Sequence, residues 1–152
     1  MRHDFNDLRH LIVEQWRNLA DSYIRFRASG DDFNDLVERP AMCRLLGDVK
    51  GLRVLDAGCG TGFYARGEQH PGVAVSSRML EEAQRLTALD GLTIDYREAD
   101  LESLSIFSDA SFDAVVCSVV ISVRLSQIMH ELARVLRPGG CLFFSDIHPM
   151  FN

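Results

Sequence analysis

Residues 54–62 read Val-Leu-Asp-Ala-Gly-Cys-Gly-Thr-Gly, a short apolar run that leads through an acid into three glycines at alternate positions. This pattern is typical of a β-strand followed by a tight turn, because glycine adopts backbone angles that other residues avoid. Glycines also let a backbone approach a ligand without side chains in the way. Ligands in open α/β sheets bind outside the carboxyl ends of the strands, so we expect a ligand at this loop.

The chemistry of the loop favours a cofactor that carries an amino acid over a dinucleotide. Phe63, Tyr64 and Ala65 occupy the stretch in which the dinucleotide motif GxGxxG needs its third glycine. The acid that dinucleotide-binding folds place about 20 residues further on is also absent. Asp56 would repel a pyrophosphate, whereas its carboxylate suits a cationic group such as an ammonium.

Strand and helix patterns alternate downstream of the loop. We expect strands over residues 52–57, 73–75, 93–96, 112–120 and 141–147, and helices over residues 78–89 and 125–136. Pro138 and the glycines after it predict the end of the second helix and a turn into the last strand. Alternating strands and helices predict a doubly wound α/β fold, with a mostly parallel sheet and helices on both faces.

The sequence before residue 51 predicts helices. Apolar side chains recur there at spacings of three and four residues, at Leu8, Leu11, Ile12, Trp16, Leu19 and Tyr23. This spacing predicts one amphipathic helix, and a second helix is expected from about Pro40 to Gly47. We therefore expect a helical cap over residues 1–50 on a ligand-binding core over residues 51–152, together forming one compact domain.

The sequence resembles the class I, Rossmann-like S-adenosylmethionine (SAM) methyltransferases of the small-molecule type, over roughly residues 16 to 149. Beside the glycine loop, further segments match this family in order. They are Trp16 with Ala20 and Tyr23, and residues 77–80, 96–100, 112–117 and 131–140. The order of these segments carries the resemblance, since a glycine loop alone is a weak signal.

The resemblance implies SAM as the cofactor. Asp56, Gly58 and Gly60 would hold its methionine part, and Tyr23 would help to cover it. For Asp56 a second interpretation stays open, in which the carboxylate only caps the turn that follows. SAM is already reactive, so the protein mainly supplies proximity and alignment, and the sequence assigns no catalytic base.

The resemblance places the adenosine part at other positions. Asp100 and Leu101 would flank the adenine, Met79 would pack near the adenosine, and Cys117 would line the pocket after the fourth strand. Asp100 is alternatively a helix N-cap, and Cys117 is alternatively a core residue. His148 is either a turn residue or a base at the ligand end of the sheet.

Two departures from the family pattern bear on activity. The family has an acid at the end of the second strand that binds both ribose hydroxyls, and Ala74 stands at that position. The stretch between Gly62 and Ala74 is also several residues shorter than in the family. Because the sequence stops at Asn152, we expect the family's C-terminal antiparallel strands to be missing. This predicts either an uncovered sheet edge and self-association or a fragment of a longer chain.

Composition excludes several classes of protein. The net charge of −6 argues against a nucleic-acid partner, which needs a basic stripe. No apolar run reaches the roughly 20 residues of a membrane span, and the N-terminus lacks an apolar signal core, so a cytoplasmic protein is expected. The four cysteines lack metal-ligand spacing, so we expect reduced thiols and no metal site.

These observations favour a SAM-dependent methyltransferase that acts on a small molecule. The alternative is a methyltransferase fold that binds a partner without catalysis, because Ala74 replaces the ribose-binding acid. A nucleotide-dependent oxidoreductase is a third and weaker alternative, since the acid that binds the ribose of NAD is missing as well.

Overall fold

The protein's structure is a computed structural model that describes residues 5–28, 34–119 and 124–146. Five parallel strands form one sheet in the order β3-β2-β1-β4-β5. The strands are β1 (Val54–Ala57), β2 (Gly72–Ala74), β3 (Tyr96–Glu98), β4 (Phe112–Ser118) and β5 (Leu136–Ser145). The strand order reverses at β1, so the expected doubly wound, Rossmann-like sheet is confirmed, and the glycine loop lies at its switch point.

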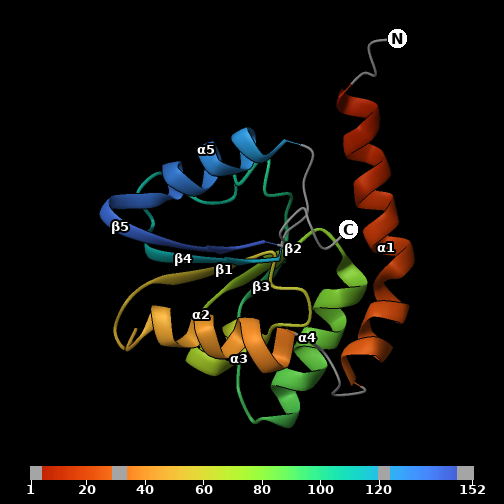
Figure 1. The fold of residues 1–152 in the computed structure, drawn as a ribbon, viewed down its shortest axis with the longest axis horizontal. Helices are drawn as coiled ribbons and strands as arrows, with labels where there is room; N and C mark the ends of the chain where they lie inside the picture. The colour runs from red at the N-terminus through yellow and green to blue at the C-terminus, as the bar shows by residue number, and fades with distance from the viewer. Residues whose placement is uncertain (1–4, 29–33, 120–123, 147–152) are drawn as a thin grey trace.

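Helices cover both faces of the sheet (Figure 1). They are α1 (Phe5–Ala28), the π-helical turn η1 (Asn34–Glu38), α2 (Arg39–Leu46), α3 (Phe63–Glu68), α4 (Ser77–Leu89) and α5 (Leu125–Val135). Helix α5 covers one face, and α2, α3 and α4 lie on the other (Figure 1). Helix α1 packs on α4 and stands at the edge toward which the strands run, so the N-terminal helices come close to the carboxyl ends of the strands (Figure 1).

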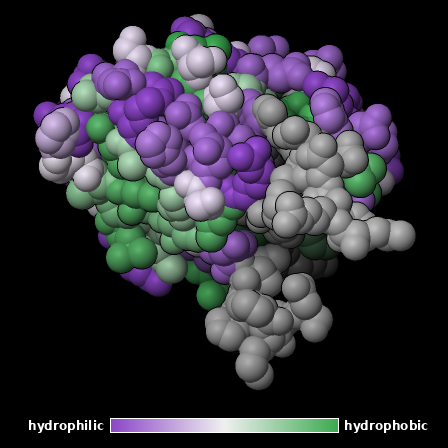
Figure 2. All heavy atoms as spheres, turned by 90° about the horizontal axis from the view of Figure 1, so that it is seen from above, coloured by the Kyte–Doolittle hydropathy of each residue, from purple (hydrophilic) through white to green (hydrophobic). Residues whose placement is uncertain are grey.

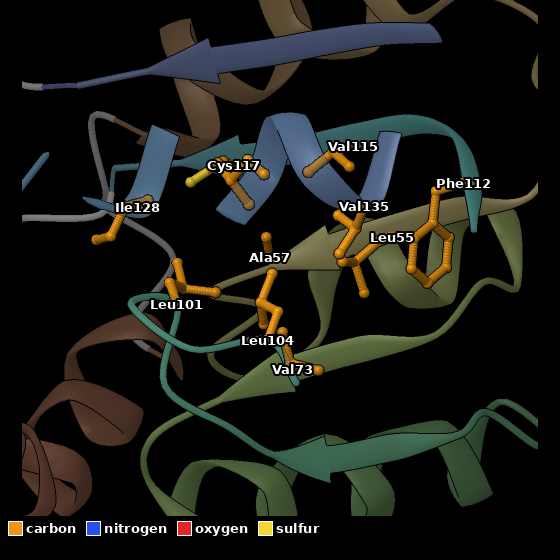
Figure 3. Packing of buried hydrophobic residues seen from close by; sticks show 11 residues of the cluster. Leu55, Ala57, Val73, Leu101, Leu104, Phe112, Val115, Cys117, Ile128 and Val135 are labelled. Carbon is orange, nitrogen blue, oxygen red and sulfur yellow. The ribbon is translucent and has the colours of Figure 1, made fainter. Parts of the chain in front are cut away.

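The core beneath α5 fixes the position of β1 and β4 (Figure 3). Leu55 and Val115 from the sheet meet Leu132 and Val135 from the helix, and all four side chains are fully buried. Burial of each such side chain contributes about 1.5–3 kcal/mol. Successive side chains of a strand point to opposite faces of the sheet. Since Asp56 follows Leu55 in β1, its side chain faces away from this cluster and toward α3.

Four of the five strands begin elsewhere than the sequence predicts, β1 and β2 by one or two residues and β3 and β5 by more. Strand β3 covers Tyr96–Glu98 rather than residues 93–96, because the three-residue β2 offers pairing only from Tyr96 onward. Strand β5 begins at Leu136 rather than at Cys141. The intervening residues bulge out between the pairs Phe112–Leu136 and Ala114–Cys141, at a turn where Gly139 has a φ of +80°.

The short stretch after the glycine loop folds as α3, a helix of six residues. It ends where Gln69 adopts a left-handed conformation with a φ of 56°. A continuous long helix is thus absent in residues 63–72, as the sequence predicts. The next helix, α4, begins with a cap in which the Ser76 hydroxyl accepts a bond from the Met79 N–H.

The surface on the α5 side of the molecule is not uniform in character. From the α5 side it is mostly hydrophilic, with apolar side chains gathered at one margin (Figure 2). Within the described residues β5 is an edge strand, and its Leu142, Phe143 and Phe144 are only half-buried. Among the residues that the structure describes, no helix has the length and apolar character needed to cross a membrane.

Candidate functional site

A pocket lies at the carboxyl end of β1, between the glycine loop and the N-terminal helices. The space in and above it measures about 440 Å³, which includes open solvent. Its lining residues come from α1, η1, α2, β1, the glycine loop, α3 and the end of β4. They are Tyr23, Arg27, Asn34, Glu38, Arg39, Asp56, Gly58, Cys59, Gly60, Thr61, Phe63, Tyr64, Ser118 and Val119.

The glycines of the loop serve different purposes. Gly58, Gly60 and Gly62 all have positive φ angles, of 84°, 52° and 77°. Residues other than glycine rarely adopt such backbone angles. A Cβ on Gly60 would meet nothing within 4 Å, so open space lies before this residue. A Cβ on Gly62 would instead lie 2.9 Å from Cζ of Tyr96. Gly60 therefore leaves room for a ligand, whereas Gly62 allows close packing within the fold.

Asp56 is a buried carboxylate in the pocket wall, with 2% of its surface exposed. Its Oδ2 accepts a bond of 3.1 Å from the Ala65 N–H, which ties the strand to α3. Burial, and to a smaller degree the nearby Glu38 carboxylate, raises the pKa of Asp56 to about 7. Asp56 thus caps a backbone donor and also offers negative charge to the pocket.

Glu38 is a second carboxylate in the same pocket, and sequence reasoning missed it. It ends η1 and lies close enough to Asp56 to act on its charge. The run Glu38-Arg39-Pro40 could have drawn attention to Glu38, because an acid and a base directly precede a proline that marks a helix start. The sequence analysis used only Pro40, to place the start of the helix.

Two guanidinium groups also line the pocket. Arg27 and Arg39 both donate to Oδ1 of Asp35, Arg27 at 2.9 Å. The Arg39 guanidinium lies 3.7 Å from the ring centroid of Phe63, a cation–π contact. The side chain of Arg27 is only 7% exposed. The pocket therefore presents carboxylates and guanidinium groups to the same space.

The structure brings four of the eight sequence-predicted site residues together, and these are Tyr23, Asp56, Gly58 and Gly60. Tyr23 reaches the pocket from α1, where its ring packs edge-on against Trp16 at 5.8 Å. Desolvation by burial raises the pKa of the Tyr23 phenol, so its hydroxyl keeps its proton at neutral pH.

The other four residues lie outside the lining of this pocket. Cys117 and Leu101 are buried in the cluster beneath α5 (Figure 3). Met79 is buried at the start of α4. Oδ1 of Asp100 accepts a bond of 2.9 Å from the Glu102 N–H within a turn.

Ala74 ends β2, where the sequence predicts the family's ribose-binding position. It is 6% exposed, in a cluster with Cys59, Leu80, Ala83 and Tyr96. Strand β2 itself therefore ends without a carboxylate, whereas Glu98, the partner of Ala74 on β3, accepts a bond from Arg17. His148, the base considered from the sequence, lies outside the described residues.

Comparison with known proteins connects this arrangement to one family. Residues 55–144 match the family model described as a methyltransferase domain. The chain is 38% identical over 112 residues to the ubiquinone biosynthesis O-methyltransferase of Paracidovorax citrulli, covering 68% of this chain and 47% of that protein. The chain thus spans about half the length of the curated relatives it matches.

Solved structures show the same likeness. A SAM-dependent methyltransferase from Mesorhizobium loti is 31% identical with a TM-score of 0.65, covering 74% of this chain and 53% of that one. The [4+2]-cyclase SpnF is also 31% identical, with a TM-score of 0.58, covering 63% of this chain and 39% of that one. With its parallel sheet and glycine loop, and with the family model matching more than half its length, this chain belongs to the class I SAM-dependent methyltransferase family.

Proposed function

We propose that this protein transfers a methyl group from SAM to a small molecule, with the pocket at the carboxyl end of β1 as the cofactor site. One observation carries the proposal. Asp56, Gly58 and Gly60 line a single pocket beside the switch point of the sheet, where open α/β sheets bind ligands.

The residues of the pocket fit the amino-acid end of SAM. The space before Gly60, which a Cβ would enter, gives the cofactor a close approach to the backbone. The Asp56 carboxylate suits the ammonium group, and the guanidinium groups of Arg27 and Arg39 suit the carboxylate. SAM supplies an electrophilic methyl group when it is bound. The protein's part is to hold both reactants in line and to exclude water.

The relatives favour an oxygen atom as the methyl acceptor. Several of them are named ubiquinone biosynthesis O-methyltransferase, at 31–38% identity. We propose accordingly a hydroxylated small molecule as substrate and the cytoplasm as the site of action. Incubation of the full chain with SAM and a panel of phenols tests this through formation of S-adenosylhomocysteine (SAH). Formation of SAH with at least one phenol supports the proposal, and its absence from the whole panel despite SAM binding would contradict it.

A second candidate is a methyltransferase fold that binds a ligand without transferring methyl groups. Two observations favour it: Ala74 stands at the ribose-binding position, and SpnF, a similar fold at 31% identity, is named a cyclase. Fold alone does not decide between such functions. SAM binding without SAH formation would support this second function.

We expect Ala74→Asp to tighten SAM binding by at least about tenfold, since a hydrogen bond to a charged group contributes about 1.5–3 kcal/mol. The new carboxylate would face the ribose hydroxyls at the end of β2. Because Ala74 packs in an apolar cluster, the same change should lower the stability of the ligand-free protein. Calorimetry with SAM and with an analogue that lacks both ribose hydroxyls measures the effect. An equal gain for both ligands, or no gain in a folded variant, would show that Ala74 does not face the ribose.

We also propose that the protein self-associates through the outer edge of β5. This strand has no further neighbour among the described residues, and unpaired edges invite pairing with another chain. A second copy would cover the half-buried Leu142, Phe143 and Phe144. Light scattering at high protein concentration should give at least twice the monomer mass of 17.1 kDa, and the monomer mass itself would rule out this edge as a stable interface.

A further inference from the structure

The side chain of Glu38 connects elements that are far apart in the sequence. Its Oε2 accepts a bond of 2.8 Å from the Tyr64 hydroxyl. Its Oε1 accepts bonds of 2.7 Å from the hydroxyls of Ser118 and Ser145. These donors belong to α3 and to the last residues of β4 and β5, whereas Glu38 ends η1. One carboxylate therefore fixes the N-terminal segment to three elements of the core.

The partners of Glu38 are neutral in the part of the chain that the structure describes. The adjacent Arg39 pairs with Asp35, and no cationic group lies within ion-pair distance of Glu38 among those residues. Glu38 is half-buried, and it lines the same pocket as Tyr64 and Ser118. Its carboxylate therefore determines how the hydroxyl groups of that pocket wall are oriented.

The hydrogen bonds fix the polarity of the pocket wall. A hydroxyl has one hydrogen and two lone pairs, and an ionised carboxylate can only accept. When Tyr64 and Ser118 donate their single hydrogens to Glu38, their oxygens have only lone pairs left for the pocket that both residues line. Burial, followed by the bond to Glu38, raises the pKa of the Tyr64 phenol above its ordinary value, so Tyr64 keeps this hydrogen at neutral pH.

We propose that Glu38 makes this wall a surface of hydrogen-bond acceptors, and so sets the specificity of the pocket for a ligand with N–H donors. Resting on the proposed function, the inference assigns the wall to the ammonium end of the cofactor. An ammonium group has three hydrogens to donate. Asp56, Tyr64 and Ser118 supply acceptors for them from three different elements. Glu38 acts through its neighbours and is a positioning residue.

The test compares SAH with an analogue that has hydrogen in place of the α-amino group, by calorimetry at pH 8. Wild-type protein should prefer SAH by at least about tenfold, the effect of one charge-assisted hydrogen bond. In Glu38→Gln the amide donates to one hydroxyl oxygen, which frees that hydroxyl's hydrogen to face the pocket. The preference should then fall to roughly threefold or less, while the affinity for the analogue stays within about twofold of wild type.

Two further variants keep the test decisive. Glu14→Gln makes the same chemical change on the exposed surface of α1 and should leave the preference unchanged. Ser118→Ala removes one acceptor while Glu38 keeps two of its partners, and it should reduce the preference even if Glu38→Gln does not fold. An equal loss of affinity for both ligands would show that Glu38 only maintains the shape of the pocket. A full preference for SAH in folded Glu38→Gln would also overturn the inference, whereas wild-type protein that does not bind SAH would overturn the proposed function itself.

Discussion

Asp56→Asn is expected to stabilise the ligand-free protein at pH 8 and to weaken SAM binding at the same time. Asp56 is 2% exposed and accepts one backbone bond, so its charge is poorly solvated. Its pKa, raised from 3.8 to about 7 by burial, corresponds to about 4 kcal/mol against the charged form. The amide oxygen of Asn can still accept from Ala65, but its buried NH2 group would cost about 1–3 kcal/mol if unpaired. We therefore expect a net gain of about 1–3 kcal/mol.

The pH dependence of this effect has a definite sign. The pKa of Asp56 is higher in the folded protein than in the unfolded chain, so the folded protein binds more protons between about pH 4 and pH 7. The contribution of Asp56 to the free energy of unfolding therefore falls as the pH rises through this window, and it is constant above the window. Urea denaturation at pH 5 and pH 8 measures the contribution as the difference between wild type and Asp56→Asn.

The control for this experiment is Asp48→Asn, which changes an exposed carboxyl group in the loop before β1. It should leave both stability and SAM affinity close to those of wild type. Loss of the Asp56 charge should weaken SAM binding about 10- to 150-fold, since a charged hydrogen bond contributes about 1.5–3 kcal/mol. A variant that is less stable than wild type at pH 8, or that binds SAM as tightly, would contradict the role given to Asp56.

Gly60→Val should abolish SAM binding and leave a folded protein. A Cβ at this position meets no protein atom within 4 Å, so the branched side chain would occupy the space reserved for the cofactor. The φ of 52° is unfavourable for valine and should cost about 1–3 kcal/mol of stability. Calorimetric titration with SAM, together with a thermal unfolding curve, separates the loss of binding from the loss of stability. We expect a loss in affinity of more than about 100-fold, equivalent to about 3 kcal/mol.

Two other glycines give matched comparisons. Gly62→Ala should mainly destabilise the fold, because its Cβ would press on the Tyr96 ring. Gly67 lies on α3, and an added Cβ would meet open space there. Gly67→Ala should therefore leave the stability of the protein unchanged or raise it by up to about 1 kcal/mol. Unchanged SAM affinity in folded Gly60→Val would place the cofactor elsewhere.

The sequence predicts the architecture because local patterns determine it. The apolar run into Gly58, Gly60 and Gly62 identifies β1 and the turn after it, and alternating elements then require a parallel sheet. The ends of the strands are less predictable, because they depend on the neighbouring strands with which they pair. Strand β3 begins at Tyr96 since β2 is short, and nothing in residues 93–98 reveals the length of a neighbouring strand.

Two residues show why the site is only partly predictable. Strand β4 is buried on both faces, so its apolar sequence gives no alternation from which to assign a direction to Cys117. Its side chain lies in the cluster beneath α5, while the next residue, Ser118, lines the pocket. Glu38 finds its partners 26, 80 and 107 residues away, and only the folded chain brings them together.

The central claim is that SAM binds in the pocket formed by the glycine loop and Asp56. Parallel calorimetric titrations of the full chain with SAM and with NAD at pH 8 test it most directly. We expect binding of one SAM per chain and none of NAD, with SAM binding lost in Gly60→Val and weakened at least about tenfold in Asp56→Asn. Binding of NAD, or SAM binding of equal strength in wild type and in both folded variants, would contradict the claim.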